Sequence, residues 1–180
     1  MDRGRDERLI SSRKVFEGRL LAVRVDEVEL SDGRRATREV VAHPGAVAIV
    51  PLLPDGRVVL IRQYRHAAGR MLWELPAGVL EKGEEPLDCA HRELVEETGY
   101  IAGKLSPLFS VFLSPGFSTE LIHLFLAQDL QKVEAAPEAD ERLEIVELPL
   151  AEAEAMVRRG EVQNAAAVCG LLAVATRDCT

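Results

Sequence analysis

Three carboxylates fall close together on one predicted helix of this 180-residue chain. Glu93 and Glu97 are four residues apart and Glu96 is three residues after Glu93, so a helix projects all three onto one side. Like charges at this spacing repel one another and lower helix stability unless a cation lies among them. A hard divalent ion that prefers oxygen ligands, Mg²⁺ or Mn²⁺, is the natural occupant. The pattern predicts a divalent metal site, with a solvated acidic helix face as the alternative.

Residues next to this helix favour the metal site. Glu81 and Glu84 lie in the loop before the helix and can fold back toward the same carboxylates. Arg92 keeps its charge at all working pH values, and its planar fork can hold a carboxylate in one orientation. We therefore predict that Arg92 orients one of the acidic side chains.

The spacing of these residues is specific. Five residues separate Gly78 from Glu84, and seven more separate Glu84 from the run Arg92-Glu93-Leu94-Val95-Glu96-Glu97-Thr98-Gly99. This stretch resembles the Nudix box, G-x5-E-x7-R-E-U-x-E-E-x-G-U, at all seven fixed identities. It departs only in the last apolar position, where Tyr100 replaces Ile, Leu or Val and can still pack. A match of this length is far more specific than a short glycine motif.

Three segments flanking the box extend the likeness. They resemble segments of the ADP-ribose pyrophosphatase branch of the Nudix hydrolases, and the resemblance runs from about Arg13 to Val168. It implies a Nudix α/β/α sandwich with a mixed sheet, hydrolysis of ADP-ribose to AMP and ribose 5-phosphate, and a homodimer whose N-terminal β-modules help complete the partner's site. The segments are Arg62-Gln63-Tyr64-Arg65, Trp73-Glu74-Leu75-Pro76-Ala77-Gly78 and Ser114-Pro115-Gly116-Phe117-Ser118-Thr119-Glu120.

The resemblance also implies a metal-ligand set. Glu93 and Glu97, with the backbone carbonyl of Ala77, correspond to the ligands, and Glu84 and Glu96 correspond to further ligands or water-mediated supports. Two or three Mg²⁺ ions would neutralise the pyrophosphate and lower the pKa of bound water. Water would then be the nucleophile.

A general base is expected outside the box. In the resembling branch it is a glutamate in the loop before the last strand, which corresponds here to the acidic stretch 134–141. Glu141 aligns best, and Glu138 and Asp140 are alternatives because the loop has no fixed spacing.

Side chains beyond the box are candidates for substrate contacts. Arg65 and Arg62 fit basic positions facing a diphosphate or terminal ribose, because arginine makes bidentate contacts to such oxygens; Arg62 could instead end a strand in solvent. Trp73 could stack on adenine, but a lone tryptophan beside a strand more often belongs to the core. His123, in an apolar run, favours a structural role. The predicted substrate-binding set is Arg62, Arg65 and Glu120.

The elements that must position these residues follow from the apolar pattern. Strands, one helix, further strands and two final helices indicate a mixed α/β sandwich rather than a doubly wound parallel sheet. A boundary near His43-Pro44 separates an N-terminal antiparallel β-module, 1–44, from the Nudix domain, 45–180. The strands are expected at 20–30, 35–43, 46–53, 58–64, 108–113, 121–127 and 143–148, and the helices at 86–98, 150–159 and 163–176.

Composition excludes several function classes. The net charge of −8 and pI near 5.1 disfavour binding to nucleic acid through a basic face. The three cysteines are odd in number and lack CxxC spacing, which argues against a disulfide framework or structural zinc. No secretory signal is visible and the apolar stretches 45–53 and 165–175 are too short to span a bilayer, so we expect a cytoplasmic enzyme that is not in the membrane.

Two other functions remain open. A pyrophosphatase for another nucleoside diphosphate sugar, such as GDP-mannose, would use the same chemistry, because specificity comes from pocket shape and a few hydrogen bonds. A Nudix-fold sensor would bind ADP-ribose without turnover. The sensor predicts a damaged acidic set, whereas Glu84, Glu93, Glu96 and Glu97 are all present.

Overall fold

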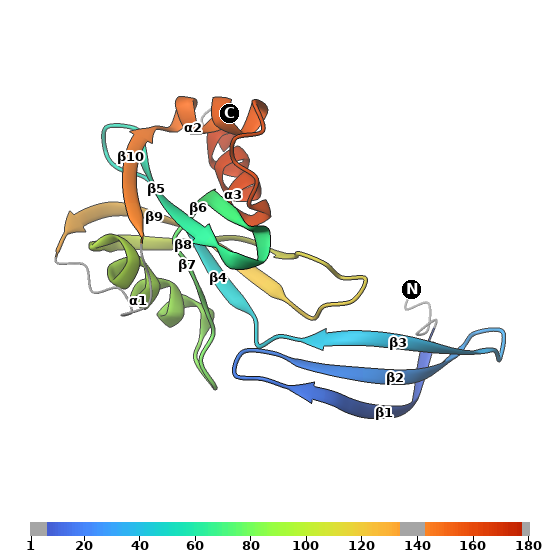
Figure 1. Ribbon diagram of the computed structural model, residues 1–180. Coiled ribbons are helices and arrows are strands. Elements are labelled where there is room, and N and C mark those ends of the chain that lie inside the picture. The colour runs from blue at the N-terminus through green and yellow to red at the C-terminus, as the bar shows by residue number, and fades with distance from the viewer. Residues whose placement is uncertain (1–6, 134–142, 178–180) are drawn as a thin grey trace. The chain divides into compact units, whose positions relative to one another are not determined.

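The computed structural model describes residues 7–133 and 143–177 (Figure 1). Contacts divide the chain into two compact units. The N-terminal unit comprises Met1–Gly45 and Phe112–Glu120, and the core unit comprises Ala46–Val111 and Leu121–Thr180. Of the described helices, none is long and apolar enough to cross a membrane.

The N-terminal unit is a three-stranded antiparallel sheet in the order β1-β2-β3. The strands are β1 (Glu7–Glu17), β2 (Ala22–Leu30) and β3 (Arg35–Ala42). The sequence predicted the last two but not β1, whose side chains are mostly exposed and therefore lack the alternation that marks a half-buried strand. The segment Phe112–Glu120 pairs with β3, since Val41 N donates to Phe117 O at 2.7 Å and Thr119 N donates to Val41 O at 3.0 Å.

A buried carboxylate joins the first two strands of this unit. Asp26 on β2 is 7% exposed and accepts hydrogen bonds from Ser12 Oγ at 2.6 Å and Arg24 Nε at 2.9 Å. These bonds, the one from Ser12 first, lower the pKa of Asp26 below its usual range. The charge is thus paired where it leaves water, as a buried carboxylate requires.

The core unit contains two sheets. In the first, of order β7-β4-β9-β8, β4 runs parallel to β9 and antiparallel to β7. In the second, of order β10-β5-β6, both pairings are antiparallel. The strands are β4 (Ala46–Pro51), β5 (Arg57–Arg65), β6 (Arg70–Glu74), β7 (Ala77–Val79), β8 (Tyr100–Phe112), β9 (Leu121–Lys132) and β10 (Glu144–Pro149). The helices are the short η1 (His66–Ala68), α1 (Pro86–Thr98), α2 (Leu150–Arg158) and α3 (Ala165–Ala175).

Helices cover both faces of the first sheet. Val47 and Ile49 of β4 are fully buried in one cluster with Leu94 of α1. On the opposite face, Gly170 of α3 lies so close that an added Cβ would stand 2.9 Å from Val50 Cγ2. Because successive strand residues alternate between faces, α1 and α3 sandwich the sheet. The predicted α/β/α sandwich with a mixed sheet is confirmed.

Helix α1 has the boundaries that the sequence predicted. Pro86 occupies its first turn, where a missing N–H is harmless. Gly99 ends it at φ 68°, a left-handed conformation that favours glycine, and donates its N–H to Val95 O at 2.9 Å. The next residue, Tyr100, is 6% exposed in the core, and its hydroxyl donates to Glu147 at 2.6 Å. The departure from the box therefore packs as expected and adds a polar link to β10.

Some strand predictions were wrong or incomplete. β8 begins directly after Gly99, whereas the sequence placed a strand only at 108–113. Its burial alternates only over residues 100–103 and is irregular beyond them, so the sequence carries little periodic signal for the rest of the strand. β6 and β7 were missed, since five and three residues are too few for a periodic signal.

Candidate active site

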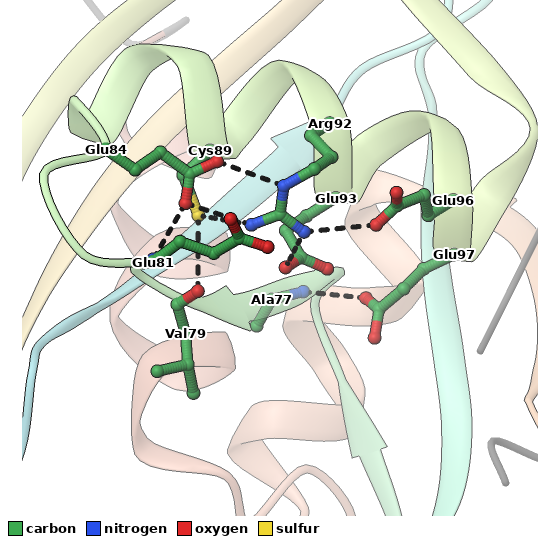
Figure 2. Close-up of polar contacts among 9 residues, drawn as sticks. All are labelled: Ala77, Val79, Glu81, Glu84, Cys89, Arg92, Glu93, Glu96 and Glu97. Atoms are coloured by element: carbon green, nitrogen blue, oxygen red, sulfur yellow. Dashed lines mark hydrogen bonds and ion pairs between the residues drawn. The ribbon is translucent and has the colours of Figure 1, made fainter. Parts of the chain in front are cut away.

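One arginine gathers three of the predicted metal-site carboxylates (Figure 2). Arg92 binds Glu84 through two bonds, Nε to Oε1 and Nη2 to Oε2, both 3.0 Å long. Its Nη1 donates to Glu93 Oε1 at 2.6 Å and to Glu96 Oε2 at 3.1 Å. The three acids come from the loop and from two successive turns of α1, so the helix and its preceding loop together build the cluster.

This cation offsets the repulsion among the acids. The hydrogen bonds from Arg92 hold the pKa of Glu84 down to about 2, although burial acts in the opposite direction. The bond to Glu84 is also the largest cause that raises the pKa of Arg92 above its usual value. Glu84 and Arg92 are thus both charged at neutral pH, and the orienting contact predicted for Arg92 is present.

The fourth carboxylate is tied to the strand below the helix. Glu97 is 3% exposed, and its Oε2 accepts a hydrogen bond from Ala77 N at 2.8 Å. The sequence alternatively predicted that the acidic residues form a solvated helix face. Glu97 does not fit that prediction, because it is buried. The same contact holds the start of β7, whose Ala77 carbonyl is a predicted metal ligand, against α1.

The absence of a side chain at Gly78 makes room for Glu93. A Cβ added at Gly78 would lie 1.9 Å from both Cδ and Oε1 of Glu93, far inside van der Waals contact. Only glycine therefore lets this carboxylate lie against β7. Cys89, also on α1, is fully buried, and burial raises the pKa of its thiol to about 12, which supports packing rather than reactivity.

The donor set suits a hard divalent ion. Oxygen atoms of Glu84, Glu93 and Glu96 all lie 2.6–3.1 Å from nitrogens of one guanidinium, so this site already accumulates negative charge around a cation. Carboxylate oxygens are the ligands that Mg²⁺ and Mn²⁺ prefer. Within residues 7–133 and 143–177, no three acidic, histidine or cysteine side chains already form a metal-holding group. The residues fit Mg²⁺ in their chemistry, with Arg92 holding three of them in this structure.

The two predicted substrate arginines lie on opposite faces of the second sheet. Val59 packs in the cluster with α1, and residues 61, 63 and 65 of β5 follow it on the same face. Arg65 therefore lies on the α1 side, where its Nε and Nη2 bind Glu74. Arg62 lies on the other side, 5.5 Å from the ring centre of Trp73. Trp73 is half-buried and lies outside the fully buried core, with the Arg62 guanidinium over its ring.

The remaining candidates are placed as follows. Glu120 belongs to the N-terminal unit, where its N–H donates to Ser118 Oγ at 3.1 Å. His123 Nδ1 lies 2.8 Å from Ser110 Oγ, the structural hydrogen bond expected for it. The base candidates lie outside the described residues: Glu141, Glu138 and Asp140.

Sequence reasoning missed Glu74. It is 2% exposed and makes three hydrogen bonds with Arg65. The available signal was a single carboxylate between Leu72-Trp73 and Leu75-Pro76, because a charge inside an apolar run is buried only when it is paired.

Two family matches cover most of the chain. Residues 42–168 match the NUDIX domain, and residues 7–41 match the nucleoside diphosphate sugar hydrolase N-terminal domain. The chain belongs to the Nudix family of hydrolases.

Individual relatives refine this assignment. The chain is 41% identical to an ADP-ribose pyrophosphatase of Bacillus subtilis (strain 168), over 89% of this chain and 88% of the relative. It is 43% identical to a GDP-mannose pyrophosphatase of Citrobacter koseri, over 59% of this chain and 60% of that protein. A solved structure described as an ADP compounds hydrolase superposes with a TM-score of 0.85 at 27% identity, over 96% and 94% of the two chains. The chain is thus similar to ADP-ribose pyrophosphatases along nearly its whole length.

Proposed function

We propose that this enzyme hydrolyses the pyrophosphate bond of ADP-ribose to AMP and ribose 5-phosphate with Mg²⁺ as cofactor. The observation that carries the proposal is the convergence of Glu84, Glu93 and Glu96 on Arg92. Glu97 lies beside them, bonded to Ala77. An intact acidic set of this kind supports turnover rather than sensing. Similarity over both units to an ADP-ribose pyrophosphatase supports the substrate.

The residues of this chain divide the work. Glu93, Glu97 and the Ala77 carbonyl would hold the metal, with Glu84 and Glu96 as further or water-mediated ligands. When bound, two or three Mg²⁺ ions supply charge neutralisation of the pyrophosphate and a lowered pKa of water. Arg92 orients the carboxylates, and Gly78 leaves the room that Glu93 requires.

The substrate and the attacking water need further groups. We propose that Arg65 binds diphosphate oxygens on the α1 side of β5, where its side chain is 45% exposed. Arg62 and Glu120 remain proposed substrate contacts. Glu141 is the proposed general base, which would accept a proton from the attacking water, with Glu138 and Asp140 as alternatives.

GDP-mannose is the second candidate substrate. The 43% identity to a GDP-mannose pyrophosphatase favours it, but that similarity covers 59% of this chain. The metal chemistry would be unchanged, and pocket contacts alone would decide between adenine and guanine nucleotides.

Product analysis tests the reaction and the substrate together. Purified protein is incubated with ADP-ribose, GDP-mannose, NADH and diadenosine polyphosphates, each with Mg²⁺ and with EDTA. We expect AMP and ribose 5-phosphate from ADP-ribose, formed only with Mg²⁺. GMP from GDP-mannose above all would retain the metal site and replace the substrate. Binding of ADP-ribose without any turnover would favour the sensor.

We further propose a homodimer formed through the N-terminal β-module, 1–44. The module exposes apolar side chains that would gain from burial, Leu9 58%, Val15 45%, Phe16 55% and Leu20 51%, and the segment Phe112–Glu120 of the same unit adds Phe117 57%. Light scattering at micromolar concentration should give twice the 19.8 kDa chain mass. Leu9→Ser with Phe16→Ser should shift the mass toward the monomer, whereas a wild-type monomer contradicts the proposal.

A cytoplasmic location is proposed as well. Cys89 and Cys169 are free thiols, which suits a reducing compartment.

A further inference from the structure

A buried carboxylate on β6 is devoted to one arginine. Glu74 is 2% exposed, and Arg65 donates to it from Nε, at 3.1 Å to Oε1 and 3.0 Å to Oε2, and from Nη2, at 2.7 Å to Oε2. The contact is bidentate, the arrangement that fixes a guanidinium most tightly. Glu74 is buried while the Arg65 side chain is 45% exposed, and the cost of taking the carboxylate out of water offsets much of its attraction to the arginine. The effect of the Glu74–Arg65 contact is therefore to be found in the orientation that it gives to the arginine.

The strand register places this pair beside the catalytic elements. Glu74 is directly opposite Ile61 on β5, and Arg65 is four residues further along the same strand, on the same face. That face is the one on which Val59 packs with α1. Glu74 also ends β6 three residues before Ala77, whose N–H binds Glu97. The pair thus lies on the α1 side of the sheet, on the chain segment that enters the proposed metal site.

We propose that Glu74 is a positioning residue that presets the guanidinium of Arg65 for the substrate diphosphate. Arginine has a long, flexible side chain, and immobilising it on binding costs conformational entropy. Because Glu74 engages the Nε and Nη2 edge, it fixes the plane of the fork and the direction of Nη1. The conformational entropy of the Arg65 side chain is then lost when the protein folds. Substrate binding does not have to order this side chain, because it is already oriented. This inference rests on the proposed binding role of Arg65.

The test compares Glu74→Gln and Glu74→Asp with wild type, alone and combined with Arg65→Met. Glu74→Gln should raise the KM for ADP-ribose by about 10-fold and change kcat by less than about 2-fold, because binding and not chemistry loses an interaction. Glu74→Asp keeps the negative charge, so its KM should lie between those of wild type and Glu74→Gln. In the Arg65→Met background, Glu74→Gln should cause no further rise in KM, since there is no longer a guanidinium to position.

Glu147→Gln is the matched control. Glu147 lies on the other flank of β5 and binds Arg57 at 2.6 Å, so its loss also breaks a Glu–Arg pair of the same sheet. It should lower the melting temperature without raising KM. A KM rise as large in Glu147→Gln, or one that persists in the Arg65→Met background, would reduce Glu74 to a structural role and overturn the inference.

A binding measurement separates this inference from the proposed function. Calorimetry with inorganic pyrophosphate, in the absence of Mg²⁺, should show affinity weakened to a similar extent, within about 2-fold, by Glu74→Gln and by Arg65→Met, without an additive effect. That result supports the positioning role even where ADP-ribose is not turned over. Equal pyrophosphate affinity in wild type and Glu74→Gln would overturn it even where ADP-ribose is hydrolysed.

Discussion

Replacing Glu97 by glutamine should lower the kcat for ADP-ribose on the order of 10³-fold while the protein stays folded. Glutamine has nearly the same shape, and its amide oxygen can still accept the 2.8 Å hydrogen bond from Ala77 N. The fold therefore keeps its link between α1 and β7. The change removes one negative charge from a proposed metal ligand, and neutral amides hold Mg²⁺ less strongly than carboxylates.

The measurement is a Mg²⁺ titration of initial rates, with the melting temperature recorded in parallel. Asp88→Asn is the control, because it makes the same acid-to-amide change on an exposed position of the same helix. Its rate should stay within about 2-fold of wild type, as expected of a surface change away from the site. Near-normal turnover by Glu97→Gln would exclude Glu97 as a metal ligand.

Replacing Gly78 by alanine should cause the second largest loss of kcat, after the replacement of Glu97. The new Cβ would stand 1.9 Å from Glu93 Cδ, so Glu93 must leave its position against β7. We expect a loss of about 100-fold in kcat, since misplacement by about 1 Å has this effect. Overpacking should also cost about 1–3 kcal/mol of the free energy of unfolding, measured by urea denaturation.

A double variant shows whether the clash with Glu93 is the cause. Gly78→Ala combined with Glu93→Ala removes the atoms that the new Cβ meets. Stability should return toward that of Glu93→Ala alone, while activity stays low. If the two destabilisations simply add, the damage comes from the backbone of β7 and not from Glu93.

Much of the chemistry could be predicted from the sequence, because the box residues are close along the chain. Helical spacing alone places Glu93, Glu96 and Glu97 on neighbouring positions. Pro86 and Gly99 set the helix ends through local backbone preferences, and both ends were predicted correctly. Continuous apolar runs located β4 and β5, since both faces of these strands pack in the core.

What the tertiary structure decided depends on contacts between distant segments. Nothing local reveals that Glu97 is buried against Ala77, twenty residues earlier, or that Gly78 must lack a side chain because Glu93 lies there. The faces of Arg62 and Arg65 follow only once β5 is placed between β6 and β10 with α1 on one side.

The same reason applies to strands and to partners. β1 and β8 carry little periodic signal, and pairing with β2 and β9 makes them strands. In the sequence, Glu74 is one carboxylate within an apolar run. Its partner Arg65 is revealed only by the pairing of β5 with β6. Sequence determined which groups this enzyme carries and the helix that presents the acids, because those depend on local spacing and backbone preference. Tertiary packing decided which of those groups are buried, paired and oriented, because burial and pairing arise only between segments far apart in the chain.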